Sequence, residues 1–318
     1  MPRRSRGATA VRRSGAGRAQ DSLRLLTVVA TLLLAIPAGL EAGTTAARET
    51  TDMRGQRVVA PARPARIVSL APSMTEIVFA LGAGDRLVGV TDYCDFPDEA
   101  KKKPRIGGIY TPNLEAILNL GPDLVLATSE GNREEHVRAL EELRLPVFVV
   151  RPVDFASVLE SITRVGEVLD RAVEARRLVA DMQGRADAIA RAVAGLRRPR
   201  VLYVLWGNPL IVPGRDTLIT DLIRRAGGDS ITAAEALPYP RFSVEEAVAR
   251  DPEWIILAQH GEASVDQRLR EWEALTLLPA VRKSHVRPVD GDLVHRPGPR
   301  VVDGLAAIAR IVHPERVR

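Results

Sequence analysis

Short apolar runs alternate with amphipathic stretches in the first half of the chain. Apolar residues with helical spacing occur near 73–82, 113–120 and 132–143. Ser73 and Glu76 have the spacing of a capping box, which predicts the start of the first of these helices. Helices that alternate with strands predict a parallel sheet with helices on both faces. Four runs have the length and apolar content of buried strands: 67–70, 87–90, 124–127 and 147–150.

The middle of the chain is helical, with no strand in between. Apolar residues keep one helical register over 155–169 and another over 178–196. We expect the second helix near 171–196, with Asp170 as its N-cap. About 26 residues would span about 39 Å, which is enough to run across two domains. The alternation then resumes, with strands near 201–205, 254–258 and 285–289 and helices near 217–226, 244–250 and 300–312.

A short internal repeat supports two α/β lobes of similar design. The segments 113–126 and 243–256 align at a constant offset of 130, so that Glu115 meets Glu245 and proline meets proline. An acidic residue precedes the predicted strand in each segment. We interpret the match as duplication of one α/β unit. The alternative is that two helix-to-strand turns arose independently.

The N-terminal segment is predicted to be an export signal. Its Arg residues precede an apolar run at 25–36, and helix breakers and small residues follow as far as Ala42. Twelve residues span about 18 Å as a helix, which is short of the ~30 Å hydrocarbon core of a bilayer. We therefore expect residues 1–42 to be a cleaved signal peptide, rather than a transmembrane anchor, and the product to be periplasmic. The polar, Pro-rich residues 43–64 would form a flexible leader.

The charge outside that segment is balanced. The whole chain has 45 Lys and Arg against 40 Asp and Glu, and residues 1–42 hold seven of these bases and two of these acids. The remaining residues therefore carry 38 of each sign. Because no basic excess is left for phosphate backbones, the sequence argues against nucleic acid as a partner.

The sequence shows no signature of catalytic or metal chemistry. One Cys excludes a disulfide framework, and the five His lack the i,i+4 spacing or the Cys partner of a zinc site. It has neither a phosphate-binding glycine loop nor a G-x-S-x-G turn. We therefore expect no enzyme, no bound metal and no resident cofactor.

Half of the aromatic residues fall in or beside predicted loops. Several of these loops follow strands, at the end where open α/β sheets bind ligands. Two lobes would bring such loops together around a large, partly apolar ligand. The alternative is that each aromatic side chain covers the core of its own lobe. The residues are Tyr93, Phe96, Tyr110, Trp206, Tyr239 and Phe242.

Several ordered motifs resemble those of the helical-backbone periplasmic binding proteins. The segments 66–76 and 81–91, which read RIVSLAPSMTE and LGAGDRLVGVT, are similar to the opening of that family, and Arg296-Pro-Gly-Pro-Arg300 continues the match. Members are receptors for ABC importers of cobalamin, ferric siderophores or haem. The resemblance covers roughly residues 60–315. It implies two Rossmann-like lobes with parallel sheets joined by a single long α-helix, with lobes at 65–169 and 198–318 and the linking helix at 170–197.

Within that family, the chain is most similar to the cobalamin receptors. Three places where those receptors carry Trp hold Ile109, Tyr239 and Leu293 here, so ferric siderophore and haem stay open as ligands. Arg105, Arg241 and Arg296 could instead clamp an anionic siderophore. The aromatic residues and the resemblance together give seven ligand-binding candidates: Tyr93, Ile109, Tyr110, Trp206, Tyr239, Asp292 and His295.

The resemblance also implies a partner. Glu115 and Glu245 match acidic residues that dock into arginine pockets of a permease dimer. A carboxylate near a helix N-terminus is also stabilised locally by the helix dipole, without any partner. We therefore expect a monomeric receptor that binds cobalamin between its lobes and delivers it to an ABC permease. The alternative from another class is an exported chelatase-like enzyme that would use the same Tyr and His residues.

Overall fold

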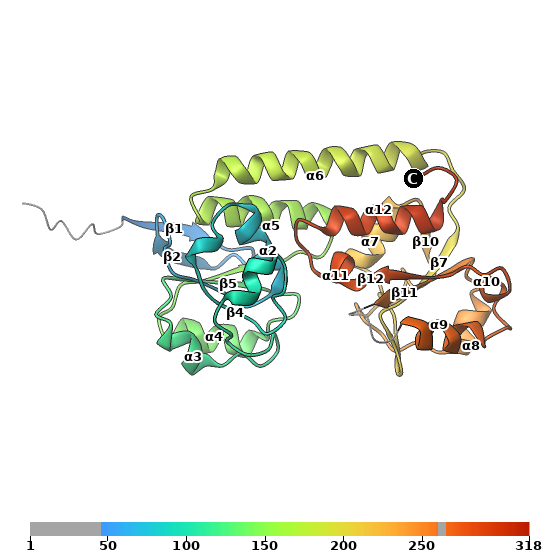
Figure 1. Cartoon of the computed structure of the whole chain (residues 1–318), viewed down its shortest axis with the longest axis horizontal. Helices are drawn as coiled ribbons and strands as arrows, with labels where there is room; N and C mark the ends of the chain where they lie inside the picture. Colours follow the sequence, from blue (N-terminus) through green and yellow to red (C-terminus); the bar gives the residue numbers. More distant parts are fainter. Residues whose placement is uncertain (1–45, 260–264, 318) are drawn as a thin grey trace, which may run out of the picture. The chain divides into compact units, whose positions relative to one another are not determined.

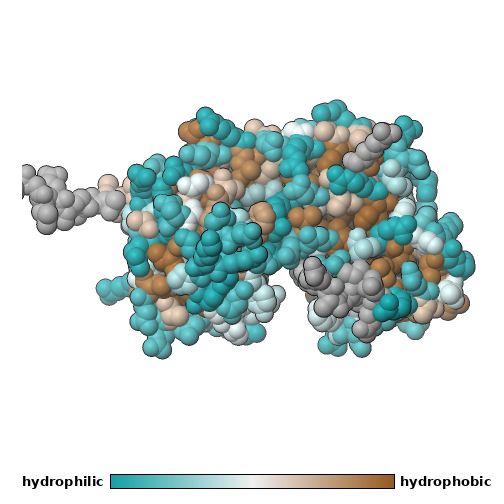
Figure 2. Space-filling model, viewed as in Figure 1, coloured by the Kyte–Doolittle hydropathy of each residue, from teal (hydrophilic) through white to brown (hydrophobic). Residues whose placement is uncertain are grey.

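The computed structural model describes residues 46–259 and 265–317. The signal peptide predicted for residues 1–42 lies outside these ranges. No helix in the described part of the chain is long and apolar enough to cross a membrane. On the face shown in Figure 2, hydrophilic residues are spread widely, and hydrophobic residues lie between them rather than in one continuous band.

Four parallel strands make the sheet of the N-terminal lobe (Figure 1). Their order across the sheet is β4 (Leu87–Val90), β3 (Ile67–Ser69), β5 (Leu124–Thr128) and β6 (Val147–Val150). The helical elements between them are α2 (Pro72–Ala80), η1 (Gly84–Arg86), η2 (Asp98–Lys102), α3 (Leu114–Asn119) and α4 (Glu134–Glu142).

The C-terminal lobe repeats this topology. Its parallel sheet has the order β10 (Asp229–Ser230), β7 (Arg200–Val204), β11 (Trp254–Gln259) and β12 (Val286–Asp290). In both sheets the order along the chain is therefore second, first, third, fourth, as duplication of one unit predicts. A small hairpin, β8 (Trp206–Gly207) and β9 (Leu210–Ile211), follows β7. The helices are α7 (Leu218–Arg225), α8 (Val244–Ala249), α9 (Val265–Glu273), α10 (Pro279–Arg282), α11 (Gly291–His295) and α12 (Val301–Val312).

Successive side chains of the buried strands in the two parallel sheets enter different cores. In β7, Val201 and Tyr203 join a large central core, whereas Leu202 and Val204 join a second core on the opposite face. All four side chains are buried. Strands buried on both faces read as continuous apolar runs, which is why the sequence predicts them well.

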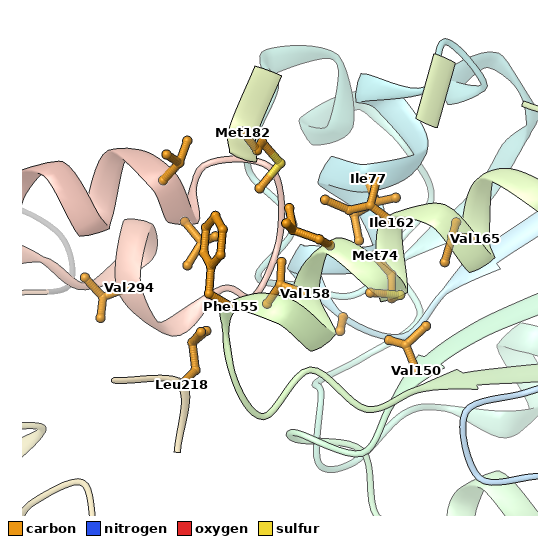
Figure 3. Packing of buried hydrophobic residues seen from close by; sticks show 14 of the residues in the cluster. Met74, Ile77, Val150, Phe155, Val158, Ile162, Val165, Met182, Leu218 and Val294 are labelled. Atoms are coloured by element: carbon orange, nitrogen blue, oxygen red, sulfur yellow. The ribbon is translucent and has the colours of Figure 1, made fainter. Parts of the chain in front are cut away.

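The central core is shared by the two lobes. The consecutive helices α5 (Phe155–Val168) and α6 (Ala172–Val193) pack against each other, and α6 also packs against α12 (Figure 1). Phe155 of α5 shares this core with Leu218 of α7 and Val294 of α11 (Figure 3). The 22 residues of α6 span about 33 Å. The α/β fold with two lobes and a long helix is confirmed, and the exact lobe boundaries stay a prediction.

The flexible leader expected at 43–64 is wrong for much of its length. Strands β1 (Ala47–Thr51) and β2 (Arg57–Pro61) form an antiparallel hairpin. In β2, Val58 and Ala60 are buried and Val59 is exposed, so the strand has the alternation of a half-buried strand. That short alternation is present in the sequence but is easily missed among its polar and proline neighbours.

Two predicted helix caps are also wrong. α2 begins two residues before the start predicted with Ser73 as N-cap. Ala71 is the N-cap and Pro72 is the first helical residue, so Ser73 lies inside the helix. Asp170 does not cap α6, whose N-cap is Arg171. Asp170 instead has a φ of 58°, the left-handed conformation that ends α5.

Candidate functional site

Two adjoining cavities lie where loops of both lobes meet. The larger has a volume of about 530 Å³ and is lined by Tyr110 and Glu130 of the N-terminal lobe and by Tyr239 and His295 of the C-terminal lobe, among others. The smaller has a volume of about 290 Å³ and shares Tyr110, Glu130 and His295 with the larger. Volumes of this size and mixed polar and apolar walls are typical of small-molecule sites.

Six of the seven predicted ligand-binding residues line these cavities. Tyr110 and His295 line both, and Tyr239 lines the larger. The smaller cavity adds the remaining three, which are Tyr93, Ile109 and Asp292.

Trp206 is the exception among the seven candidates. It is 57% exposed on β8, lines neither cavity, and its indole N–H donates to the carbonyl of Asn208 at 3.0 Å. The structure therefore does not bring Trp206 together with the other candidates.

The tyrosines present exposed rings to the cavities. Tyr93, Tyr110 and Tyr239 are 59%, 60% and 43% exposed, whereas Phe242 is buried in the core of the C-terminal lobe. The alternative of covering the core is therefore correct for Phe242 and does not account for the three tyrosines. Exposed aromatic rings that converge on a cavity are suited to stacking on an extended flat ligand.

Glu130 is a charged cavity residue that sequence reasoning missed. It lies just after β5, at the carboxyl end of a parallel strand, where ligand sites form in α/β sheets. That position is the signal that could have identified it. Burial raises the pKa of the Glu130 carboxyl group, while the hydrogen bond from Ser129 and the charge of Arg151 oppose the rise. Burial and then the charge of Glu130 raise the pKa of Tyr239 to about 12, so this phenol stays neutral.

The loop that carries Glu130 is held by Asn132. The Asn132 side-chain amide donates to the carbonyls of Leu70 at 2.8 Å and Ile109 at 3.2 Å, and its side-chain oxygen accepts from the N–H of Thr128 at 2.9 Å. This one side chain ties together three segments that border the smaller cavity. The backbone beside Glu130 is therefore fixed before any ligand binds.

His295 has a partner in the core. The hydroxyl of buried Tyr203 lies 2.9 Å from Nε2 of His295, and the two rings meet edge to face. This contact orients the imidazole at the wall shared by both cavities. No group of three or more His, Cys, Asp or Glu residues that could hold a metal ion occurs in the described part of the chain.

A charged network links the lobes beside the smaller cavity. Glu76 of α2 is 3% exposed and accepts from Nε and Nη2 of Arg300 at 2.9 and 2.6 Å. Arg296 pairs with Asp95, with Asp292 at 2.8 Å and with Glu76 at 3.5 Å. Burial lowers the pKa of Arg296, but these carboxylates outweigh burial and raise it.

The arginines proposed to clamp an anionic siderophore are mostly used elsewhere. Arg105 donates to the carbonyls of Thr91 at 2.7 Å and Cys94 at 2.9 Å, so it braces its own loop. Arg241 is exposed, pairs through its backbone with Ile211 and lines neither cavity. Only Arg296 reaches a cavity, and three carboxylates already surround it.

Glu115 and Glu245 occupy equivalent places in the two lobes. Each is exposed in the first turn of a six-residue helix, α3 or α8. Asn113 and Ser243 cap these helices by accepting from backbone N–H groups. The side chains of the two glutamates are thus free to meet a partner.

Comparison with known proteins places the chain in a family. A family model described as periplasmic binding protein matches residues 67–293, well over half of the chain. The chain belongs to the periplasmic binding protein family. It is 28% identical over 253 residues to the vitamin B12-binding protein of Vibrio parahaemolyticus, an alignment that covers 80% of this chain and 90% of that protein.

Solved members of the periplasmic binding protein family share this fold. The periplasmic vitamin B12 binding protein of Vibrio cholerae superposes with a TM-score of 0.71 at 27% identity, covering 78% of this chain and 96% of that one. A periplasmic haem binding protein from Pseudomonas aeruginosa superposes with a TM-score of 0.70 at 27% identity, covering 80% and 94%. The neighbours therefore confirm the receptor fold and include two classes of ligand.

Proposed function

We propose that the chain is the extracytoplasmic receptor of an ABC importer for a corrinoid such as cobalamin. It would be exported by the segment 1–42, act as a monomer without a resident cofactor, and release its ligand unchanged. The observation that carries the proposal is the pair of adjoining cavities with Tyr93, Tyr110 and Tyr239 exposed on their walls. A large macrocycle needs such flat apolar contacts together with polar groups at its rim.

The names of the relatives support a corrinoid first. The curated relative reported above is named as a vitamin B12-binding protein. Haem is the second candidate, favoured by His295 and Tyr110 in the cavity wall and by a haem-binding structural neighbour. A ferric siderophore is less well served, since Arg105 and Arg241 line neither cavity.

Absorption spectroscopy tests the ligand directly. Purified protein is incubated with cyanocobalamin, haemin or a ferric siderophore and then desalted, and we expect colour to be retained after cyanocobalamin. Retention of haemin or the siderophore alone would contradict the corrinoid proposal. Recovery of a changed pigment would instead indicate the chelatase-like alternative.

Tyrosine substitutions test the site. Tyr93→Ala and Tyr239→Ala should each weaken cyanocobalamin binding by about 1–3 kcal/mol, because each removes a ring that stacks on or flanks the macrocycle. Trp206→Ala is the matched control, since Trp206 is also an exposed aromatic residue but lines neither cavity. Calorimetry that finds the tyrosine variants and the control indistinguishable would remove these rings from the site.

Delivery is proposed to use the two matched glutamates. Glu115 and Glu245 would present one negative charge from each lobe to basic pockets on a permease with two similar halves. Charges at the rim of an interface mainly govern encounter and orientation, so they should matter for uptake more than for ligand binding.

A further inference from the structure

The walls of the two cavities are negatively biased. Glu130 lines both cavities and forms no ion pair within residues 46–259 and 265–317. Asp292 adds a second carboxylate, which forms an ion pair with Arg296. Arg296 is also engaged by Asp95 and Glu76, so its positive charge is already balanced. An anionic ligand therefore meets a carboxylate that has no ion-pair partner among the described residues and a guanidinium that is already paired.

Glu130 stands at the junction of the two cavities. Its backbone N–H donates to the hydroxyl of Thr128 at 3.2 Å, and the hydroxyl of Ser129 lies 3.4 Å from its carboxylate. Asn132 holds the same loop to Leu70 and Ile109, as described above. A carboxylate on a fixed backbone, bordering both cavities, is well placed to contact the rim of any ligand that spans them.

We propose that Glu130 selects ligands by charge. Its carboxylate accepts hydrogen bonds from amide or other N–H donors on the rim of a neutral or cationic metal complex, and such charge-assisted bonds are stronger than neutral ones. It repels complexes whose rim carries carboxylates, as haemin does, because two negative charges in a partly desolvated cavity interact strongly. This inference rests on the proposed corrinoid function and names the residue that separates a corrinoid from haem.

The test compares binding of three probes to three proteins. Wild type, Glu130→Gln and Glu142→Gln are titrated with cyanocobalamin, haemin and haemin dimethyl ester, whose rim has no carboxylate. Glu142 is the matched control, because it is exposed at the end of α4 and lines neither cavity. Circular dichroism and a thermal melt confirm that each variant is folded.

If Glu130 selects ligands by charge, the Kd of haemin divided by the Kd of cyanocobalamin should depend on this residue. Glu130→Gln should lower this ratio at least tenfold, about 1.4 kcal/mol, and Glu142→Gln should leave it within twofold of wild type. The increase in haemin affinity should shrink at high salt, which screens charges. The dimethyl ester, which has no carboxylate, should show no increase in affinity.

The possible failures are distinguishable. If wild type binds cyanocobalamin but Glu130→Gln leaves the ratio unchanged, charge selection is overturned and the corrinoid function stands. An equal gain for haemin and its dimethyl ester also overturns it, since the effect would then be steric. If wild type binds haemin and not cyanocobalamin, the proposed function itself fails, and charge selection fails with it.

Discussion

Glu76 shows how much one buried carboxylate can organise. It lies inside α2 and is nearly inaccessible to solvent. Its carboxylate pairs with the guanidiniums of Arg300, which is the N-cap of α12, and of Arg296, which lies four residues earlier. Arg300 also lies 4.1 Å above the ring of Phe96. Burying these charges is expensive, and their mutual pairing is what offsets the cost of desolvation.

Removing this carboxylate should destabilise the protein. Glu76→Gln leaves Arg300 without its carboxylate partner, so we expect the free energy of unfolding to fall by about 3 kcal/mol. Urea denaturation at pH 7 measures the change, and Glu99→Gln, on the exposed turn η2, serves as the control. A loss below about 1 kcal/mol would show that water takes over the role of Glu76.

The roles of two single residues, Glu76 and Glu130, were not predicted from the sequence. The Ser73 to Glu76 spacing fits a capping box, yet Pro72 starts the helix earlier and Glu76 serves Arg300 instead. Local pattern cannot reveal a partner 224 positions away. Glu130 had a sequence signal in its position just after β5, but only the folded loop shows that it lines two cavities at once.

The helix-to-strand unit that repeats in the two lobes is held by equivalent hydrogen bonds in each lobe. In the N-terminal lobe, the carboxylate of Asp123 accepts from the N–H of Arg66 at 2.9 Å, and Arg66 donates to the carbonyl of Gly121 at 3.0 Å. In the C-terminal lobe, Glu253 accepts from the N–H of Arg200 at 3.0 Å, and Arg200 donates to the carbonyl of Asp251 at 2.7 Å. The turn residues Gly121 and Asp251 both have a left-handed backbone conformation, with φ of 53° and 47° respectively.

These equivalent bonds favour duplication over two independent turns. Asp123 and Glu253 lie 130 positions apart, and each joins the start of the third strand to the start of the first. The acidic residue before each strand, visible in the sequence, thus has a structural role in both lobes.

The second of these carboxylates should make stability depend on pH. Arg197, through its hydrogen bonds, is the main cause that lowers the pKa of Glu253 to about 2; burial opposes this, and the Arg200 N–H adds to the lowering. A lowered pKa contributes stability above the unfolded value of 4.5, and that stability is lost as pH falls toward 2.

Because the Glu253 pair is partly exposed, its contribution is modest. Glu253→Gln should lower the free energy of unfolding by about 1–2 kcal/mol at pH 7, and the difference from wild type should vanish near pH 2. Urea titrations from pH 7 to pH 2 measure it, with exposed Glu273→Gln as the control. A difference that is constant with pH would exclude the charge of Glu253 as its source.

At the level of elements, burial decided what could be predicted. Strands that are buried on both faces, such as β5 and β11, stand out as apolar runs. The two-residue strands β8, β9 and β10 carry no such signal, because two residues are too few to show an apolar pattern. The candidate site was predicted mainly from aromatic residues after strands, and three of these tyrosines line the cavities whereas Trp206 does not.

The two lobes offer a partner one carboxylate each. Glu115 and Glu245 are exposed on capped helices of matched design, and a permease with two similar halves could meet both at once. Simultaneous contact at two points would orient the receptor over the transport pathway.

Reversing both charges should separate transport from binding. Glu115→Lys with Glu245→Lys should abolish uptake in cells, while the purified variant keeps its cyanocobalamin affinity within about threefold, or ~0.7 kcal/mol. Glu142→Lys with Glu273→Lys controls for the change in net charge. Normal uptake by the first double variant would exclude the docking role, and a parallel loss of ligand binding would indicate a folding defect.

The central core has a consequence for how the chain comes apart. Phe155, Met182, Leu218 and Val294 belong to one continuous apolar cluster, although they come from both sides of the duplicated design. Pulling one half away would expose the apolar surface of the other, so partial opening carries a large cost in free energy. The molecule should therefore melt in a single cooperative transition. Because the two halves share this cluster, neither should keep its full stability when it is separated from the other.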